Sequence, residues 1–224
     1  MSTCRTGQRR RIACCTAFFQ YLAGTCDTIL VLCIRVGDAS QVSSKLMTDS
    51  DHAGCSETRR SRSGWCHFIH GSHDMNCGAL VDWGSKRQPS TALSPPAAET
   101  IATVEGLVKT GLVVSGILDD VYGRLVPMSV ECDCDPARQN ILNGGGLGGL
   151  KHVAKHPGVR VGFLRDLFVQ NHELSLPRVD TTCNTADIFT KPLDLQTFTR
   201  YKAGLGLVSM SSVGESRKSR GGQL

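Results

Sequence analysis

The stretch TDSDHAGCSETRRSRSGW, from Thr48 to Trp65, decides the fold because it joins two predicted strands through a polar turn. Short runs typical of strands lie on either side of it, at 45–48 and 65–69, and a third follows at 79–83. Gly, Ser, Asp and Asn separate the three runs. The sequence therefore predicts an antiparallel meander of three strands, with Asp49 at the end of the first.

Beyond the meander, the hydrophobic pattern changes to that of a helix. Apolar residues between 97 and 122 recur at roughly helical spacing, and Ser94-Pro95-Pro96 before them is a typical helix start. Buried strands are predicted at 125–132 and 173–179, and a last helix runs from Thr185 to about Gly204. Because a helix follows three strands, the pattern indicates an α/β domain.

Four acidic residues, Asp49, Glu99, Asp133 and Asp187, each stand in a distinctive phrase. The phrases are TDSDHAGCSETRRSRSGW (48–65), WGSKRQPSTALSPPAAETIA (83–102), CDCDPA (132–137) and NTADIFTKPL (184–193). They resemble the ribonuclease H domain at the end of copia-type retrotransposon Pol polyproteins. YLAGT (21–25) is similar to the element that closes the preceding reverse transcriptase region. The resemblance covers about residues 19–207, nearly all of the chain.

This resemblance implies a ribonuclease H-like α/β fold: a mixed five-stranded sheet, three antiparallel strands then two parallel, flanked by helices. It also divides the chain. Residues 1–43 are expected to be a remnant of the reverse transcriptase or connection segment, and residues 44–207 the ribonuclease H-like domain. Residues 208–224 are expected to form a disordered Ser/Gly/Arg-rich tail. At 224 residues and 40% hydrophobic, the chain is long enough to bury one core.

Asp49, Glu99, Asp133 and Asp187 are the predicted catalytic and metal-binding residues. Hydrolysis of a phosphodiester builds charge on the attacking and leaving oxygens, and two divalent ions ~3.5–4 Å apart stabilise both. Carboxylates suit magnesium, which prefers hard oxygen ligands. The resemblance implies two magnesium ions, replaceable by manganese, bridged by Asp49, and hydrolysis of the RNA strand of an RNA–DNA hybrid. Four crowded carboxylates repel one another, so at least one raised pKa is expected.

Basic residues near the predicted site are candidates for contacts with the hybrid's phosphates. They are Arg59, Arg60, Arg62, Lys86 and Arg87. Such residues position a duplex without reading its sequence, although a run of this kind is equally typical of a solvated hairpin face. The net charge of +5 permits nucleic-acid binding without requiring it. The expected partners are an RNA–DNA hybrid and a reverse transcriptase domain, with no small-molecule cofactor; the G-x-G-x-x-G match at 144–149 lacks a preceding strand and predicts a flexible loop.

The cysteines and the N-terminus bear on the compartment. Eleven cysteines do not form a recognisable disulfide framework, which indicates reduced thiols in an intracellular protein, cytoplasmic or nuclear. The segment RRRIACCTAFFQYLAG (9–24) superficially resembles a signal peptide, but Thr16 and Gln20 interrupt it and its apolar residues recur at helical spacing. It predicts an amphipathic helix. No run of the ~20 apolar residues of a membrane span is evident, so no membrane contact is expected.

Two other interpretations stay open at this level. A catalytically inactive relic would keep the fold and the four acids, and would act at most as a nucleic-acid or protein binding module. A zinc-binding regulatory protein would use Cys66, His70, His73 and Cys77, whose C-x3-H-x2-H-x3-C spacing offers tetrahedral ligands. The simpler interpretation of that segment is a hairpin whose side chains alternate between faces.

Departures from the family phrases predict a weakly held Glu99 and low activity. Ala97 stands where the family usually has an acid, and Thr100 where an aromatic residue normally follows the Glu. Three glycines, Gly106, Gly111 and Gly116, interrupt the predicted helix, each at a cost of ~1 kcal/mol relative to Ala. The insertion AKHPG (154–158) is expected to disrupt a region that the family makes helical.

Overall fold

The chain is organised as two compact units. The computed structural model describes residues 16, 18–32, 34, 39–71, 78–143, 155–170 and 173–211, with only the backbone at 155–159. The smaller unit contains a helical segment at 18–24 and the strands β1 (Thr28–Leu30) and β7 (Leu207–Ser209), which pair antiparallel. The larger unit, from Leu32 to Leu205, contains the other elements, beginning with the short 3-10 helix η1 (Ala39–Gln41).

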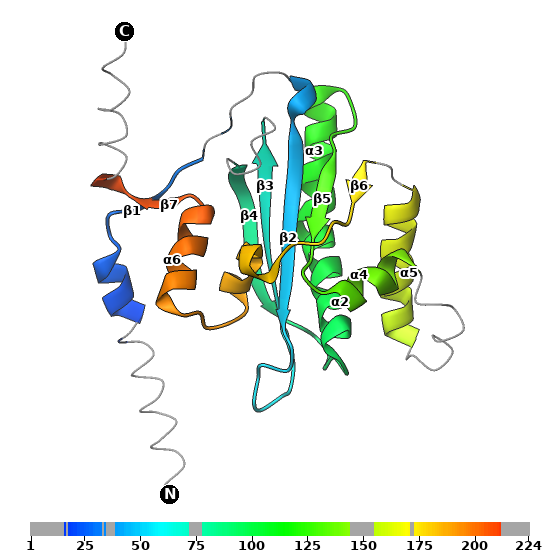
Figure 1. Cartoon of the computed structure of the whole chain (residues 1–224), viewed down its shortest axis with the longest axis horizontal. Coiled ribbons are helices and arrows are strands. Elements are labelled where there is room, and N and C mark those ends of the chain that lie inside the picture. Colours follow the sequence, from blue (N-terminus) through cyan, green and yellow to red (C-terminus); the bar gives the residue numbers. More distant parts are fainter. Residues whose placement is uncertain are drawn as a thin grey trace, which may run out of the picture. The chain divides into compact units, whose positions relative to one another are not determined.

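A five-stranded sheet in the order β4-β3-β2-β5-β6 forms the centre of the larger unit (Figure 1). The strands β2 (Ser43–Asp51), β3 (Arg62–His70) and β4 (Gly78–Arg87) make the antiparallel meander. β5 (Met128–Glu131) runs parallel to β2, and β6 (Leu174–Ser175) runs parallel to β5. The predicted ribonuclease H-like fold, with three antiparallel strands and then two parallel ones, is confirmed.

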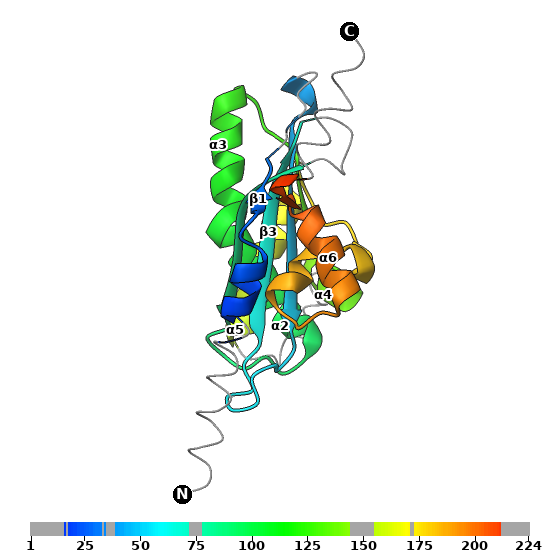
Figure 2. The ribbon, with the colours of Figure 1, turned by 90° about the vertical axis from the view of Figure 1, so that its left-hand side faces the viewer.

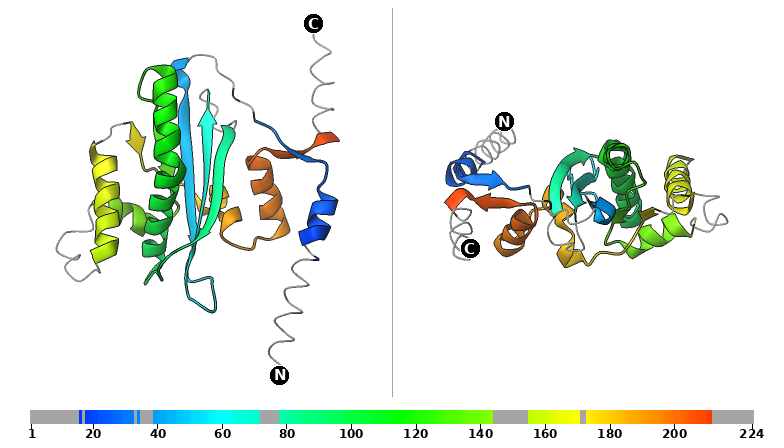
Figure 3. Two further views of the ribbon diagram at one scale, coloured as in Figure 1. Left: turned by 180° about the vertical axis from the view of Figure 1, so that it is seen from behind. Right: turned by 90° about the horizontal axis from the view of Figure 1, so that it is seen from above.

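A long helical segment packs on one face of this sheet (Figure 3). α2 (Pro95–Gly106) starts at Ser94, whose side chain accepts a hydrogen bond from the Ala97 N–H, and proline fills its first positions. A π-helical turn, Leu107–Gly111, continues it into α3 (Leu112–Tyr122), which ends at Gly123 in the left-handed conformation, φ 61°. The helix predicted over 97–122 is therefore confirmed.

The opposite face of the sheet carries the C-terminal elements of the larger unit, so that α3 and α6 lie on opposite sides of the sheet (Figure 2). They are two 3-10 helices, η4 (Thr181–Cys183) and η5 (Thr185–Phe189), and the helix α6 (Leu195–Gly204). The prediction of one continuous helix from Thr185 is wrong. Pro192 has no N–H and restricts the residue before it, and α6 starts afresh at Asp194, whose side chain accepts the Thr197 N–H.

Two further expectations about elements need correction. The AKHPG insertion does not prevent a helix, because α5 spans Lys155–Gln170 and so contains most of the insertion, with Pro157 in its first turn, where proline is tolerated. The strand predicted over 173–179 is shorter: β6 has two residues, and beyond it a single bridge joins Cys132 to Arg178. The helix α4 (Asp135–Leu142) follows β5 directly.

The main core lies between the sheet and the helices. Leu46 of β2 and Trp65 of β3 pack there with Leu107 of the π turn, and α4 and α5 add Ile141 and Leu164. All are buried. Burying side chains of this size stabilises a fold by roughly 1.5–3 kcal/mol each, so this cluster holds the long helical segment against the strands.

The glycines of the helical segment play a different part from the one expected. A Cβ at Gly106 would stand 3.0 Å from Thr48 Cγ2, and one at Gly111 would stand 3.2 Å from Leu46 Cδ2. Both glycines therefore let the helix approach β2 closely. Only Gly116 of the three has nothing within 4 Å, so the stabilisation expected from alanine applies there and not at Gly106 or Gly111.

By length and composition alone, the continuous segment Pro95–Tyr122 is long and apolar enough to cross a membrane, contrary to the expectation that no such run exists. Ala98, Ala102 and Leu107 within it are fully buried. A buried core helix passes the same test, so the length and composition of this segment do not by themselves indicate a membrane span.

Some sequence predictions fall outside the described residues. His73 and Cys77 of the proposed zinc cluster, the glycine-rich stretch at 144–149, and residues 1–15 and 212–224 belong to this group. Cys66 and His70, the two described members of the cluster, are buried in β3.

Candidate active site

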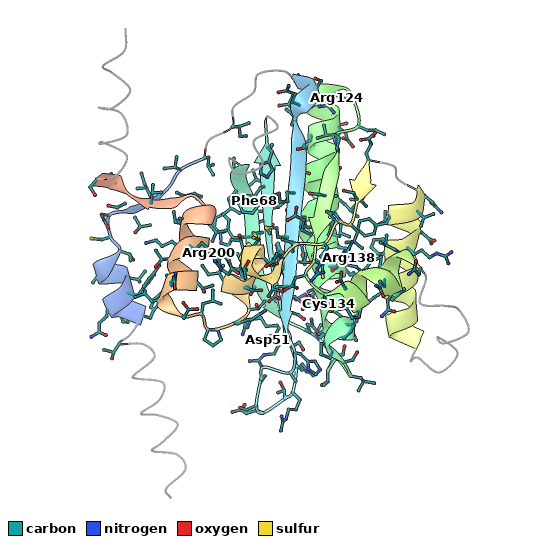
Figure 4. The ribbon with its side chains drawn as sticks, viewed as in Figure 1. Asp51, Phe68, Arg124, Cys134, Arg138 and Arg200 are labelled. Carbon is teal, nitrogen blue, oxygen red and sulfur yellow. The ribbon has the colours of Figure 1, made fainter. Side chains whose placement is uncertain are left out.

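The four predicted carboxylates come from four separate elements and meet at one end of the sheet. Asp49 lies in β2, Glu99 in α2, Asp133 just after β5, and Asp187 in η5. β2 and β5 are parallel neighbours in which Met47 pairs with Glu131, so two residues further on Asp49 and Asp133 stand side by side. Carboxylate oxygens of Asp49, Asp133 and Asp187 lie within 4.8 Å of one another. Figure 4 shows Asp51, which ends β2, and Cys134, which precedes α4, at this end of the sheet.

Glu99 is the acid that α2 contributes to the cluster, and it is buried. Its Oε1 accepts hydrogen bonds from the Ser50 backbone N–H (3.1 Å) and from Ser50 Oγ (3.0 Å), and its Oε2 faces Cys132 Sγ at 3.9 Å. Burial, and to a smaller extent the negative charges of Asp49 and Asp133, raise the pKa of Glu99 to about 8. The expectation of a raised carboxylate pKa is therefore met, although burial contributes more than repulsion.

A glutamine forms hydrogen bonds that join the sheet to the end of α2 that carries Glu99. Gln88 is fully buried. Its Nε2 donates to Ser63 Oγ at 3.1 Å and to the Ala98 carbonyl at 2.9 Å, one residue before Glu99. Together with Ser50, this contact fixes Glu99 at the sheet and weakens the expectation of a loosely held ligand.

η5 brings Asp187 to the cluster through close packing on the sheet. The buried Asn184 donates from Nδ2 to the Thr48 carbonyl at 3.0 Å and accepts the Ala186 N–H, which ties η5 to β2 beside Asp49. Gly64 pairs with Asp49 across β2 and β3, and a Cβ there would stand 2.9 Å from Phe189 Cβ and 3.0 Å from the Ala186 carbonyl oxygen. Only a residue without a side chain leaves room for η5 at this position.

Lys191 supplies positive charge to the cluster. Its Nζ lies 3.2 Å from Asp49 Oδ1 and 3.0 Å from Asp187 Oδ1. Burial lowers the pKa of Lys191, but the adjacent Asp49 and Asp187 carboxylates outweigh it, so the pKa is raised and the ammonium stays charged. Asp49 is 1% exposed and also accepts a hydrogen bond from Thr190 Oγ1. Burial and the Asp49 charge raise the pKa of Asp187 to about 7.

Sequence reasoning missed Lys191, Thr190 and Asn184 as contributors to the site. All three stand in the phrase NTADIFTKPL, which had been noted for Asp187 alone. Lys191 follows Asp187 by four residues, the spacing at which a helical turn brings opposite charges together, so this spacing was the available signal.

The predicted phosphate-binding residues lie at the β3–β4 end of the sheet and in the hairpin before it. Arg62 pairs with Arg87 across the two strands, and Lys86 forms an ion pair with Glu105 at 3.4 Å. Arg59 and Arg60 lie in the exposed β2–β3 turn, where Arg59 has φ 54°. The five basic residues thus share one region, next to the strand end that carries Asp49.

The residues of the cluster fit a divalent cation. Among the described residues, Lys191 is the basic side chain that forms ion pairs within this cluster, and it pairs with Asp49 and Asp187 but not with Glu99 or Asp133. Four acids held by one ammonium leave an excess of hard oxygen donors, the ligands that magnesium and manganese prefer.

No protein-family model matches the chain. It is 29% identical over 191 residues to the retrovirus-related Pol polyprotein from transposon TNT 1-94 of Nicotiana tabacum, a match that covers 85% of this chain and 13% of the relative. It is 37% identical over 60 residues to an uncharacterized mitochondrial protein of Arabidopsis thaliana, 27% of this chain and 22% of that one. The chain thus spans less than a quarter of the length of either relative.

Several solved ribonuclease H structures are similar to the chain, and two of them illustrate the extent of the similarity. RNase H1 of Halobacterium salinarum is 16% identical, with 67% of this chain and 94% of that chain covered and a TM-score of 0.43. The foamy viral PFV RNase H domain is 11% identical, with 74% and 90% covered and a TM-score of 0.41. We base the fold assignment on the strand order, since these scores are low.

The strand order defines an α/β domain of the ribonuclease H type. The chain therefore has a ribonuclease H-like fold, and 85% of it is similar in sequence to part of a retrotransposon Pol polyprotein.

Proposed function

We propose that the chain is a metal-dependent nuclease of the ribonuclease H type that hydrolyses the RNA strand of an RNA–DNA hybrid. The observation that carries the proposal is the meeting of Asp49, Glu99, Asp133 and Asp187 from four elements at one sheet end. Carboxylates this crowded and buried are costly to a fold, and a cation-dependent reaction gives a reason to keep them.

The four acids would hold two divalent ions, magnesium or manganese, which supply charge stabilisation for the attacking and leaving oxygens of the phosphodiester. The chain's own residues position the acids. Ser50 fixes one oxygen of Glu99, and Asn184 anchors the turn that carries Asp187. Thr190 donates to Asp49 and so fixes one of its oxygens. Lys191 balances the charge of Asp49 and Asp187 before the ions arrive.

Hybrid binding is assigned to the basic residues beside the site, Arg59, Arg60, Arg62, Lys86 and Arg87. Arginine and lysine side chains bind phosphates without reading bases, and recognition of an RNA strand rests on its shape and 2′-hydroxyl groups. We keep the division into residues 1–43, 44–207 and 208–224 as part of the proposal, although residues 208 and 209 belong to the strand β7 and not to a disordered tail. A copia-type origin, a reverse transcriptase domain as partner, and an intracellular location also belong to it.

The test is cleavage of a labelled RNA–DNA hybrid by the purified chain with Mg²⁺ or Mn²⁺. We expect RNA-strand cleavage that disappears in Asp49→Asn and in Asp133→Asn, because an amide keeps the shape but removes the charge that holds the ions. Asp120→Asn is the matched control, since Asp120 is exposed on α3 away from the cluster.

Three outcomes would contradict the proposal. Wild-type cleavage by the Asp49→Asn variant would place the site elsewhere. Equal cleavage of the hybrid and of double-stranded DNA would exclude a ribonuclease H. No cleavage by a folded wild-type chain with either ion would favour the inactive relic.

A further inference from the structure

One side of the acidic cluster is left without a positive charge. Lys191 pairs with Asp49 and Asp187, whereas in the described part of the chain no basic side chain pairs with Glu99 or Asp133. On this side a thiol joins the acids. Ligand atoms of Glu99, Cys132 and Asp133 lie within 4.8 Å of one another.

Glu99 offers an oxygen that lacks a strong donor. Oε1 is occupied by the two Ser50 hydrogen bonds, and Oε2 has Cys132 Sγ at 3.9 Å as its described contact. A thiol is a weak donor, and Glu99 is 7% exposed. The hydrogen bond from Cys132 satisfies this oxygen only weakly, and it places the thiol and the carboxylate where one ion could bind to both.

Cys132 gives this side of the cluster a chemistry that the Asp49 side does not have. Its side chain is 1% exposed, so the thiol belongs to the wall of the site and not to the outer surface. Magnesium binds oxygen and avoids sulfur, whereas zinc and cadmium bind thiolates strongly. Zinc bonds of ~2.3 Å to sulfur and ~2.0–2.2 Å to oxygen place tetrahedral ligands about 3.3–3.8 Å apart. The 3.9 Å between Cys132 Sγ and Glu99 Oε2 is close to that spacing.

We propose that Glu99, Cys132 and Asp133 form a binding site for thiophilic divalent ions such as zinc or cadmium. Such an ion exchanges with the thiol proton: the S–H bond breaks, its electron pair stays on sulfur and forms the metal–sulfur bond, and the proton leaves to the buffer. Because Glu99 and Asp133 are shared with the proposed nuclease centre, the soft ion competes there with magnesium. The competition rests on the proposed function, but the binding does not.

The experiment titrates cadmium into the reduced full-length chain and follows the ultraviolet absorption of the cadmium–sulfur bond. Other cysteines contribute to this signal, so the variants decide. We expect Cys132→Ser and Glu99→Gln each to weaken the same tight binding step at least about tenfold, since even outer-shell metal partners are worth 10–100-fold. Cys183→Ser, which removes an exposed thiol of η4, should leave the step unchanged.

The Glu99→Gln variant makes the test specific, because it leaves every thiol in place, so a weaker cadmium–sulfur binding step together with the same loss in Cys132→Ser indicates that both side chains hold one ion. A wild-type titration by either variant overturns the proposal. If Cys132→Ser does not fold by circular dichroism, Glu99→Gln and Asp133→Asn carry the same comparison. In the hybrid assay, cadmium inhibition relative to each variant's own rate should weaken in Cys132→Ser. A chain that cleaves no hybrid would end the proposed function, while the spectroscopic titration would still decide the metal site.

Discussion

At the scale of single residues, Lys191 controls the charge balance of the site. Its ammonium lies between Asp49, which is 1% exposed, and Asp187. Without it, two carboxylates would face each other in a partly buried setting with the repulsion uncompensated. The position of Lys191 also resembles that of a bound cation, because it contacts two of the acids that would share an ion.

We therefore expect Lys191→Met to destabilise the metal-free chain by about 1–3 kcal/mol, since it leaves buried charges unpaired. Added Mg²⁺ should restore more stability to this variant than to the wild type. Urea unfolding with and without Mg²⁺ measures both effects. Lys109→Met, on the exposed side of the π turn, is the control and should show neither. An unchanged metal-free stability in Lys191→Met would show that the ion pairs contribute nothing.

A second residue, His67, links the sheet to the π turn. It is fully buried, and its Nδ1 lies 3.2 Å from Thr110 Oγ1. Burial lowers the pKa of His67 to about 4 from its usual 6.5. The neutral ring is thus favoured in the folded state, and the unfolded chain binds the extra proton between these two values.

Neutral His67 makes its full contribution to the free energy of unfolding above pH 6.5. This contribution, on the order of 3 kcal/mol at most, is lost as the pH falls toward 4. His67→Gln keeps a polar group for Thr110 and does not titrate, so its stability should fall less over this acid range. Urea unfolding across the range, wild type against variant, gives the comparison. If the free energy of unfolding fell equally in the two proteins over this range, the pKa of His67 would not be lowered by burial.

At the scale of elements, the site depends on how closely η5 lies on the sheet. Asn184 ties η5 to β2, and Gly64 leaves the space for it on β3. The sequence pointed to Gly64 only as part of a turn phrase. Its physical role becomes visible once η5, more than a hundred residues later, is seen packed over it.

Gly64→Ala should push η5 away from β3, because the added methyl would stand 3.0 Å from the Ala186 carbonyl oxygen, which is backbone and cannot rotate away. We expect a destabilisation of about 1–3 kcal/mol, as for other overpacked sites, together with weaker Mg²⁺ binding as Asp187 moves. Calorimetric Mg²⁺ titration and thermal unfolding measure the two. Gly116→Ala is the matched control: its methyl meets nothing within 4 Å, and it should stabilise α3 by up to ~1 kcal/mol. Equal stability of the Gly64→Ala and wild-type proteins would contradict the role given to the close approach.

At the scale of the whole molecule, sequence reasoning reached the sheet and the long helical segment because hydrophobic periodicity records which face of each element is buried. The strand after Glu173 and the helix after Thr185 were placed less well. β6 is two residues long, so little periodicity exists to read, and Pro192 breaks a pattern that otherwise continues. The approach of α2 to β2 through Gly106 was out of reach, because a propensity scale scores glycine without its neighbours.

The candidate site, too, could be predicted from the sequence only in part. Its four acids were found from their phrases, since residue type limits which chemistry is available. The Ser50, Gln88, Asn184 and Lys191 contacts depend on distances between elements that no single phrase contains. For the same reason the sequence gives no sign that Cys132 lies beside Glu99.

The protonation of the acidic cluster leads to a prediction for the stability of the whole chain. The pKa of Glu99 is raised from 4.5 to about 8, and that of Asp187 from 3.8 to about 7, so the metal-free fold holds protons that the unfolded chain releases. The stability linked to these protons is fully present below the unfolded values and is lost as the pH rises through 7 and then 8. Divalent ions replace the protons, so the stabilisation by Mg²⁺ should be small near pH ~5.5 and large near pH ~8.5. Thermal unfolding with and without Mg²⁺ at the two pH values measures this difference.

Glu99→Gln removes one of the two protons from the balance, and its metal-free stability should therefore fall less between these pH values than that of the wild type. A Mg²⁺ effect of the same size at both pH values would mean that the ions do not compete with these protons, and that the cluster is not where they bind.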